Sequence, residues 1–278
     1  MKKYQCISCR SIFENEKNGK YTCQRCGEEY DMGEKYLKTF FDKKLFNSYR
    51  KDYLLNKTLN NNGYMSYQFL KEGSISLPDR EDVKRFCNFI KENYCGRVIL
   101  DVGCGVMNIP GYLMLDNRNE LELIGIDPID DNNFDGLRIV GCSEFVPLTD
   151  DSVNTIIFAT SMDHVCNLRR TVQESHRLLS EKGKVLVWMS DRSMSILNKT
   201  GSWIHQKLRS WKLGYPVNKY YVYENWTVLG VPPGGVDPFH SYHETPKKIV
   251  KIFNDNGFQL LLEKKFSRNE VFLCLEKI

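Results

Sequence analysis

Apolar segments with the length of β-strands alternate with helical patterns over the C-terminal two thirds of the chain. Seven such segments occur, at residues 97–102, 121–128, 137–142, 153–160, 183–190, 258–266 and 270–278. This alternation is typical of an α/β fold, in which helices cover both faces of a mostly parallel sheet. We therefore predict a doubly wound, mostly parallel seven-stranded sheet.

The last two of these segments differ from the others in their spacing. Only residues 267–269 separate them, whereas parallel strands need a connection of a dozen or more residues. We therefore expect an antiparallel C-terminal hairpin. Before the first strand, Pro78 and Asp79 mark a helix start, and apolar residues follow at helical spacing: Val83, Phe86, Phe89 and Ile90.

The first strand ends in a carboxylate and a glycine turn, Asp101-Val-Gly103-Cys104-Gly105. The glycines let the backbone turn sharply and approach a ligand closely. About twenty residues later the second strand ends in Asp127, where a carboxylate can accept hydrogen bonds from the ribose of an adenosine. A nicotinamide dinucleotide is disfavoured, because its binding fingerprint needs a third glycine that the segment "GCGVMN" lacks.

Residues 97 to 190 resemble the class I S-adenosylmethionine-dependent methyltransferases, and most closely the type 11 family. The resemblance lies in "VILDVGCG", "GIDP", "GCSEFVPLTDDSVNTIIFATSMDHV" and "ESHRLLSEKGKVLVW", which occur in the family's order and spacing. It implies S-adenosylmethionine as the cofactor, with the ribose at Asp127, the adenine beside residues 142–144 and the methionine part near Asp101. The cofactor-binding residues that it implies are Asp101, Gly103, Cys104, Gly105, Asp127, Pro128, Cys142, Ser143, Glu144, Ala159 and Thr160.

Three positions depart from the family pattern. Met107 replaces the third glycine of the turn, Cys142 replaces an aspartate of the adenine loop, and Asn154 replaces the aspartate that opens the fourth strand. None of these changes removes the ribose carboxylate or the first two glycines. They leave one alternative open, a methyltransferase fold that acts as a binding module without catalysis.

Two C-x-x-C pairs lie near the start of the chain, Cys6 with Cys9 and Cys23 with Cys26. Each pair can supply two thiolates to one tetrahedral ion, and four cysteines leave no open position for water, so we expect a structural zinc. Asn18-Gly19 between the pairs favours a short hairpin. Residues 1–32 are therefore predicted to form a zinc ribbon that needs its metal to fold.

The rest of the chain divides into a polar segment, residues 33–80, read as linker and helical lead-in, and the methyltransferase domain, residues 81–278. A net charge of +4, from 39 basic and 35 acidic residues, gives no indication of a nucleic-acid partner. No apolar run approaches the roughly 20 residues that span a bilayer, and no signal peptide is evident. We expect a soluble cytoplasmic protein without a membrane partner.

A long insertion at about residues 191–243 is predicted to be a lid at the carboxyl edge of the sheet. It is rich in Tyr, Trp and Gly, which suits a small-molecule or carbohydrate-like acceptor, and we expect methylation at oxygen. A hydroxyl acceptor needs a base to remove its proton. The histidines expected at this edge are, in order of preference, His164, His243 and His240.

An RNA base methyltransferase is the alternative enzyme, because some bacterial rRNA guanine methyltransferases carry an N-terminal zinc finger before a class I domain. The predicted ribbon mixes both signs of charge, which disfavours a phosphate backbone as its partner. The ribbon also resembles stand-alone zinc modules that support methyltransferases through protein contacts, so protein contacts are a further expectation.

Overall fold

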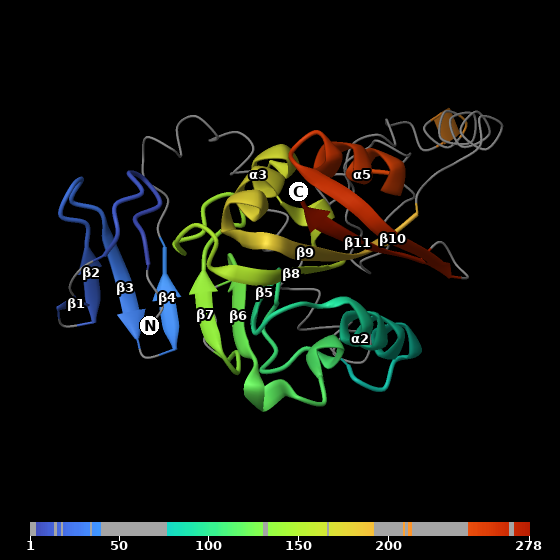
Figure 1. Cartoon of the computed structure of the whole chain (residues 1–278), viewed down its shortest axis with the longest axis horizontal. Helices are drawn as coiled ribbons and strands as arrows, with labels where there is room; N and C mark the ends of the chain where they lie inside the picture. The colour runs from blue at the N-terminus through green and yellow to red at the C-terminus, as the bar shows by residue number, and fades with distance from the viewer. Residues whose placement is uncertain are drawn as a thin grey trace.

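The computed structural model describes residues 4–13, 16–17, 19–33, 35–39, 77–129, 133–165, 167–191, 208, 211–212, 244–266 and 270–278. Its strands form a single sheet within these ranges, in the order β1-β2-β3-β4-β7-β6-β5-β8-β9-β11-β10 (Figure 1). Strands β5 to β11 are the seven that the sequence predicts. The α/β fold class is confirmed, and the N-terminal strands extend the same sheet.

The seven strands that the sequence predicts are β5 (Val98–Val102), β6 (Glu122–Asp127), β7 (Leu137–Val140), β8 (Val153–Ala159), β9 (Leu179–Ser190), β10 (Phe258–Phe266) and β11 (Glu270–Lys277). The pairs from β7 to β9 are parallel. Strand β11 is antiparallel to both β9 and β10, which confirms the predicted hairpin. Strand order reverses between β5 and β8, and ligands of open α/β sheets bind at the carboxyl edge beside such a reversal.

Among the described residues, three α-helices cover the two faces of this part of the sheet: α2 (Glu81–Asn93), α3 (Leu168–Leu178) and α5 (Pro246–Asn254). Helix α2 lies on one face, and α3 and α5 lie together on the other (Figure 1). Strand residues alternate between the two cores, so Ile99 packs with α2 whereas Leu100 and Val102 pack with α3 and α5. The apolar stripe predicted for α2 is buried, as expected.

The N-terminal strands are β1 (Glu16–Lys17), β2 (Lys20–Thr22), β3 (Glu29–Gly33) and β4 (Tyr36–Lys38). Strands β1 and β2 form the predicted hairpin around residues 18 and 19. Strand β4 pairs in parallel with β7, and its central residue Leu37 is fully buried. This pairing covers the edge of β7 that would otherwise present unpaired backbone groups.

Strand β4 falls inside the segment 33–80 that the sequence assigns to a linker, so part of that segment continues the ribbon's sheet. The boundary at residue 32 stays a prediction. Short 3-10 helices occupy three of the described connections: η2 (Gly111–Leu113), η3 (Arg118–Glu120) and η4 (Met162–His164). No helix among the described residues is long and apolar enough to cross a bilayer.

Candidate cofactor site and cysteine cluster

The glycine turn after β5 combines one crowded glycine with one open glycine. Gly103 has φ +81° and lies against the loop after β8, where an added Cβ would come within 2.4 Å of the Ser161 Cβ. Gly105 has φ +66°, and an added Cβ would meet no described atom within 4 Å. Glycine is therefore needed at 103 for packing, while the backbone at 105 borders open space that a ligand can approach.

Asp101 at the end of β5 has one satisfied and one unsatisfied carboxylate oxygen. The Tyr112 hydroxyl donates to Oδ2 at 2.9 Å, whereas Oδ1 is buried and has no hydrogen-bond partner among the described residues. The residue is 1% exposed, and this burial raises the pKa of its carboxyl to about 7. An unpaired buried acceptor of this kind is a position for a donor supplied by a ligand.

Asp127 at the end of β6 holds two loops together. Its Oδ2 accepts a hydrogen bond from the Gly105 amide at 3.0 Å, and its Oδ1 accepts one from the Ile129 amide at 2.9 Å. Each carboxylate oxygen can accept a further hydrogen bond, so ribose hydroxyls can still be bound here. Pro128, between Asp127 and Ile129 in the chain, is exposed.

Arg138 of β7 is a buried residue of this site that the sequence analysis missed. It is 1% exposed, and it donates to the Gly105 carbonyl at 2.7 Å, to the Ile129 carbonyl at 2.9 Å and to the Cys104 thiol. The guanidinium therefore connects the same two loops as Asp127, those that follow β5 and β6. The Cys104 side chain points inward to meet it, so Cys104 can offer only its backbone to a cofactor.

The predicted adenine loop is anchored to α3 by two side chains. The Ser143 hydroxyl lies 2.9 Å from the Thr171 hydroxyl, and Glu144 accepts a hydrogen bond from the Asn167 amide at 2.7 Å. The Gly141 amide, just before the loop, donates to the Asp127 carbonyl at 3.1 Å. Cys142, Ser143 and Glu144 are all buried, so the loop has a fixed shape beside Asp127.

The end of β8 leads directly to the candidate base. Ala159 is buried, Thr160 adopts φ +55° and donates its amide to the Trp188 carbonyl at 2.9 Å, and η4 follows with His164. His164 Nε2 lies 3.7 Å from Asp163 Oδ1, and its side chain is 33% exposed. Because Ser161 packs on Gly103, the structure brings this segment beside the glycine turn.

Some predicted residues cannot be placed. His240 and His243 lie outside the described residues, as does most of the predicted lid. The departure at Asn154 is structural. Its side chain accepts hydrogen bonds from the Arg97 and Val98 amides, both at 3.0 Å, at the start of β5 and so at the opposite end of that strand from the glycine turn.

The four N-terminal cysteines converge on one point. Their sulfur atoms lie within 4.8 Å of one another, with Cys6 to Cys26 at 3.5 Å and Cys9 to Cys23 at 3.4 Å. Four sulfurs at about 2.3 Å from one tetrahedral zinc would be roughly 3.8 Å apart. The set therefore fits such an ion, and the hydroxyls of Tyr30 and Ser11 lie within 3.2 Å of the Cys6 and Cys9 sulfurs.

A comparison with known protein families finds a match over part of the chain. Residues 100–187 match the type 11 family model described as a methyltransferase domain. The matched region is thus a methyltransferase domain. No curated protein matches the chain.

Two solved structures are similar to this chain. The PH0226 protein from Pyrococcus horikoshii OT3 is 14% identical with a TM-score of 0.51, covering 77% of this chain and 99% of its own. A SAM-dependent methyltransferase from Aquifex aeolicus is 13% identical with a TM-score of 0.47, covering 73% of this chain and 95% of its own. The first similarity supports the same fold for the present chain.

Proposed function

We propose that this methyltransferase transfers the methyl group to a hydroxyl of a small-molecule or carbohydrate-like acceptor. The observation that carries the cofactor site is the unpaired, buried Oδ1 of Asp101, at the end of the strand that leads into the turn with the open backbone of Gly105. In this site Asp101 would bind the methionine ammonium, and Asp127 would bind the ribose hydroxyls. The loop 142–144 would adjoin the adenine, and Ala159 and Thr160 would face the amino acid part.

S-adenosylmethionine supplies an electrophilic methyl group on its sulfonium. The protein's part is to align the acceptor for an in-line displacement and to remove a proton if the acceptor is a neutral hydroxyl. His164 follows the strand that ends at the site, and Asp163 can stabilise the imidazolium that forms when His164 takes the proton. We therefore propose His164 as the base, with His243 and His240 as the remaining candidates.

The charges of the ribbon support a small acceptor over RNA. Residues 1–32 carry six basic and five acidic side chains in mixed order, and one of the six, Arg10, is already paired with Glu174. A protein that grips phosphates needs clustered cations free to displace counterions. We propose instead that the ribbon is structural, with zinc bound by Cys6, Cys9, Cys23 and Cys26.

Replacing Asp127 by alanine tests the cofactor site. Losing hydrogen bonds to a charged group costs about 1.5 to 3 kcal/mol, so we expect S-adenosylmethionine to bind roughly 10- to 150-fold more weakly. Calorimetric titration measures this, and NAD should not compete in the wild-type protein. An alanine at exposed Asp116, on the chain between β5 and β6, is the matched control. Wild-type affinity in the Asp127 variant would rule out its role at the ribose.

The raised pKa of Asp101 predicts that cofactor binding depends on pH. Only the ionised carboxylate attracts the ammonium, so affinity should fall as the pH is lowered through about 7. Asp101→Asn should bind weakly and should lose this component of the pH dependence, since its side chain does not titrate. Titrations of both proteins between about pH 6 and 8 measure the difference. Parallel profiles would exclude Asp101 as the partner of the ammonium.

A further inference from the structure

The two cysteine turns of the ribbon share one backbone geometry but differ in the residue that follows them. Arg10 after Cys9 has φ +63°, and its amide donates to the Cys6 carbonyl at 2.9 Å. In the second turn, Gly27 has φ +76° and donates to the Cys23 carbonyl at 2.8 Å. Glycine adopts this conformation without strain, whereas arginine does not. An arginine at this strained position is therefore expected to make a side-chain contact that offsets the strain.

That side chain leaves the ribbon and binds the methyltransferase domain. Its two terminal nitrogens donate to the two carboxylate oxygens of Glu174 on α3, at 3.2 and 2.9 Å. The Glu174 side chain is 1% exposed, whereas that of Arg10 is 31% exposed. A bidentate pair of this kind fixes orientation as well as position. The Arg10–Glu174 pair therefore fixes how the ribbon packs against α3.

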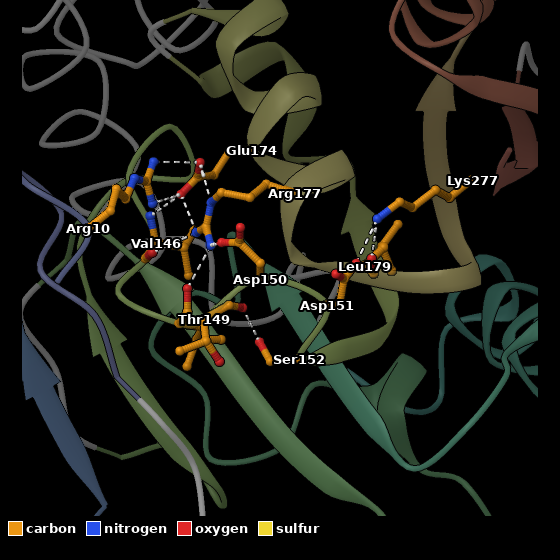
Figure 2. A network of polar contacts seen from close by, with 11 residues as sticks. Arg10, Val146, Thr149, Asp150, Asp151, Ser152, Glu174, Arg177, Leu179 and Lys277 are labelled. Atoms are coloured by element: carbon orange, nitrogen blue, oxygen red, sulfur yellow. Dashed lines mark hydrogen bonds and ion pairs between the residues drawn. The ribbon is translucent and has the colours of Figure 1, made fainter. Parts of the chain in front are cut away.

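Glu174 also binds the backbone that follows the predicted adenine loop. Its Oε1 accepts a hydrogen bond from the Val146 amide at 2.9 Å, and Arg177 pairs with the same carboxylate from the other side at 2.7 Å (Figure 2). Burial alone would raise the pKa of Glu174, but Arg177 and then Arg10 hold it below the usual value. The carboxylate is thus ionised, and it joins the ribbon, α3 and Val146.

The ribbon touches the same stretch of chain by a second route. The Gln5 amide donates to the Pro147 carbonyl at 2.9 Å, and Tyr4 forms an isolated antiparallel bridge with Leu148. Residues 146–148 are therefore held between the ribbon and α3. They lie just after residues 142–144, where the Ser143 side chain binds Thr171 on α3 and Glu144 accepts from the Asn167 amide at the start of that helix.

We propose that Arg10 is a positioning residue of the cofactor site, which acts through Glu174 and the Val146 amide to fix the loop that receives the adenine. The proposal rests on the proposed cofactor site for its effect on binding, but not for its effect on the loop. An enzyme gains affinity when the loop that contacts its ligand is already ordered, because binding then pays no ordering entropy. The ribbon thereby becomes part of the cofactor site without touching the cofactor.

Arg10→Gly is the sharpest test, because it removes the side chain and also relieves the strain at φ +63°. We expect the variant to keep its zinc and its thermal stability, and to bind S-adenosylmethionine about fivefold or more weakly, the lower end of ordinary coupling between two sites. Arg10→Lys keeps the charge but not the bidentate geometry, so its affinity should lie between the two. Hydrogen exchange should become faster at residues 142–148 of Arg10→Gly and stay unchanged in β8.

Lys277→Ala is the matched control. It removes a 2.8 Å ion pair with Asp151, which Figure 2 shows apart from the Arg10–Glu174 pair. It should leave both cofactor affinity and exchange at residues 142–148 unchanged. Wild-type exchange at those residues in Arg10→Gly would overturn the proposal whether or not the cofactor binds. Wild-type protein that fails to bind S-adenosylmethionine would instead overturn the proposed function. Faster exchange with unchanged affinity would show that Arg10 orders the loop but has no part in the cofactor site, which also overturns the proposal.

Discussion

Cys23→Ser is expected to empty the cysteine cluster and release the ribbon from its fold. Cys23 is 2% exposed and its sulfur lies 3.4 Å from that of Cys9, so serine removes one of four converging thiolates. Structural zinc contributes on the order of 10 kcal/mol to the folding of small modules, and the ribbon strands β1, β2 and β3 are too short to replace that energy. Zinc should fall from about one per chain to far below one.

The loss should spread beyond the cluster in a defined direction. Amides of β2 and β3 should lose their protection from hydrogen exchange, and β7 should become less protected because β4 covers its edge. Cys87→Ser, a buried cysteine on α2, is the control and should keep its zinc. Elemental analysis of protein purified without chelators measures the content. One zinc per chain in Cys23→Ser, with unchanged exchange, would contradict the assignment of the four ligands.

The sheet could be predicted because each strand carries its own signal. Seven apolar segments bounded by turn residues and a three-residue gap at the end specify strands β5 to β11 and the antiparallel hairpin without any long-range contact. The hairpin at Asn18-Gly19 has the same local origin. Strand β4 could not be found this way, because its three residues become a strand only through pairing with β7, roughly a hundred residues further along the chain.

The site shows the same division between local and distant causes. Asp101, Gly103 and Asp127 stand out in the sequence because strand ends, glycines and carboxylates coincide there. Arg138 sits within an apolar strand, and that misplaced charge was a signal for a buried partner that could have been read. Which groups it binds, the carbonyls of Gly105 and Ile129, depends on the packing of two loops.

The link from Arg10 to Glu174 lies beyond sequence reasoning for a different reason. The two residues are 164 positions apart, and each has an ordinary local reading, one as a ribbon side chain and the other as a polar residue of α3. What distinguishes Arg10 is its positive φ, at the position where the second cysteine turn has Gly27. An arginine in this conformation indicates that its side chain makes a contact that offsets the strain. That comparison needs the backbone conformation, which the spacing of the cysteines alone does not specify.

His164→Ala is expected to lower turnover by about 100-fold or more while leaving S-adenosylmethionine affinity nearly unchanged, the usual size of a general-base effect. The neutral hydroxyl of an acceptor is a poor nucleophile, and imidazole has a pKa suited to removing its proton near neutral pH. His164 follows β8 within the segment that packs on the glycine turn, and Asp163 lies 3.7 Å from its Nε2. The cofactor contacts proposed above do not include it, so binding should survive.

The measurement needs an acceptor, which a screen of metabolite extracts with methyl-labelled cofactor can supply. His176→Ala is the matched control, because His176 lies on α3 with its ring edge-on to Phe258, among side chains that pack α3 against α5 and the terminal hairpin. It should keep full turnover. If His164→Ala also keeps full turnover, then His243 and His240 are tested in the same way. Full turnover in all three would exclude a histidine base and would favour a mechanism in which the protein mainly aligns an atom that is already nucleophilic.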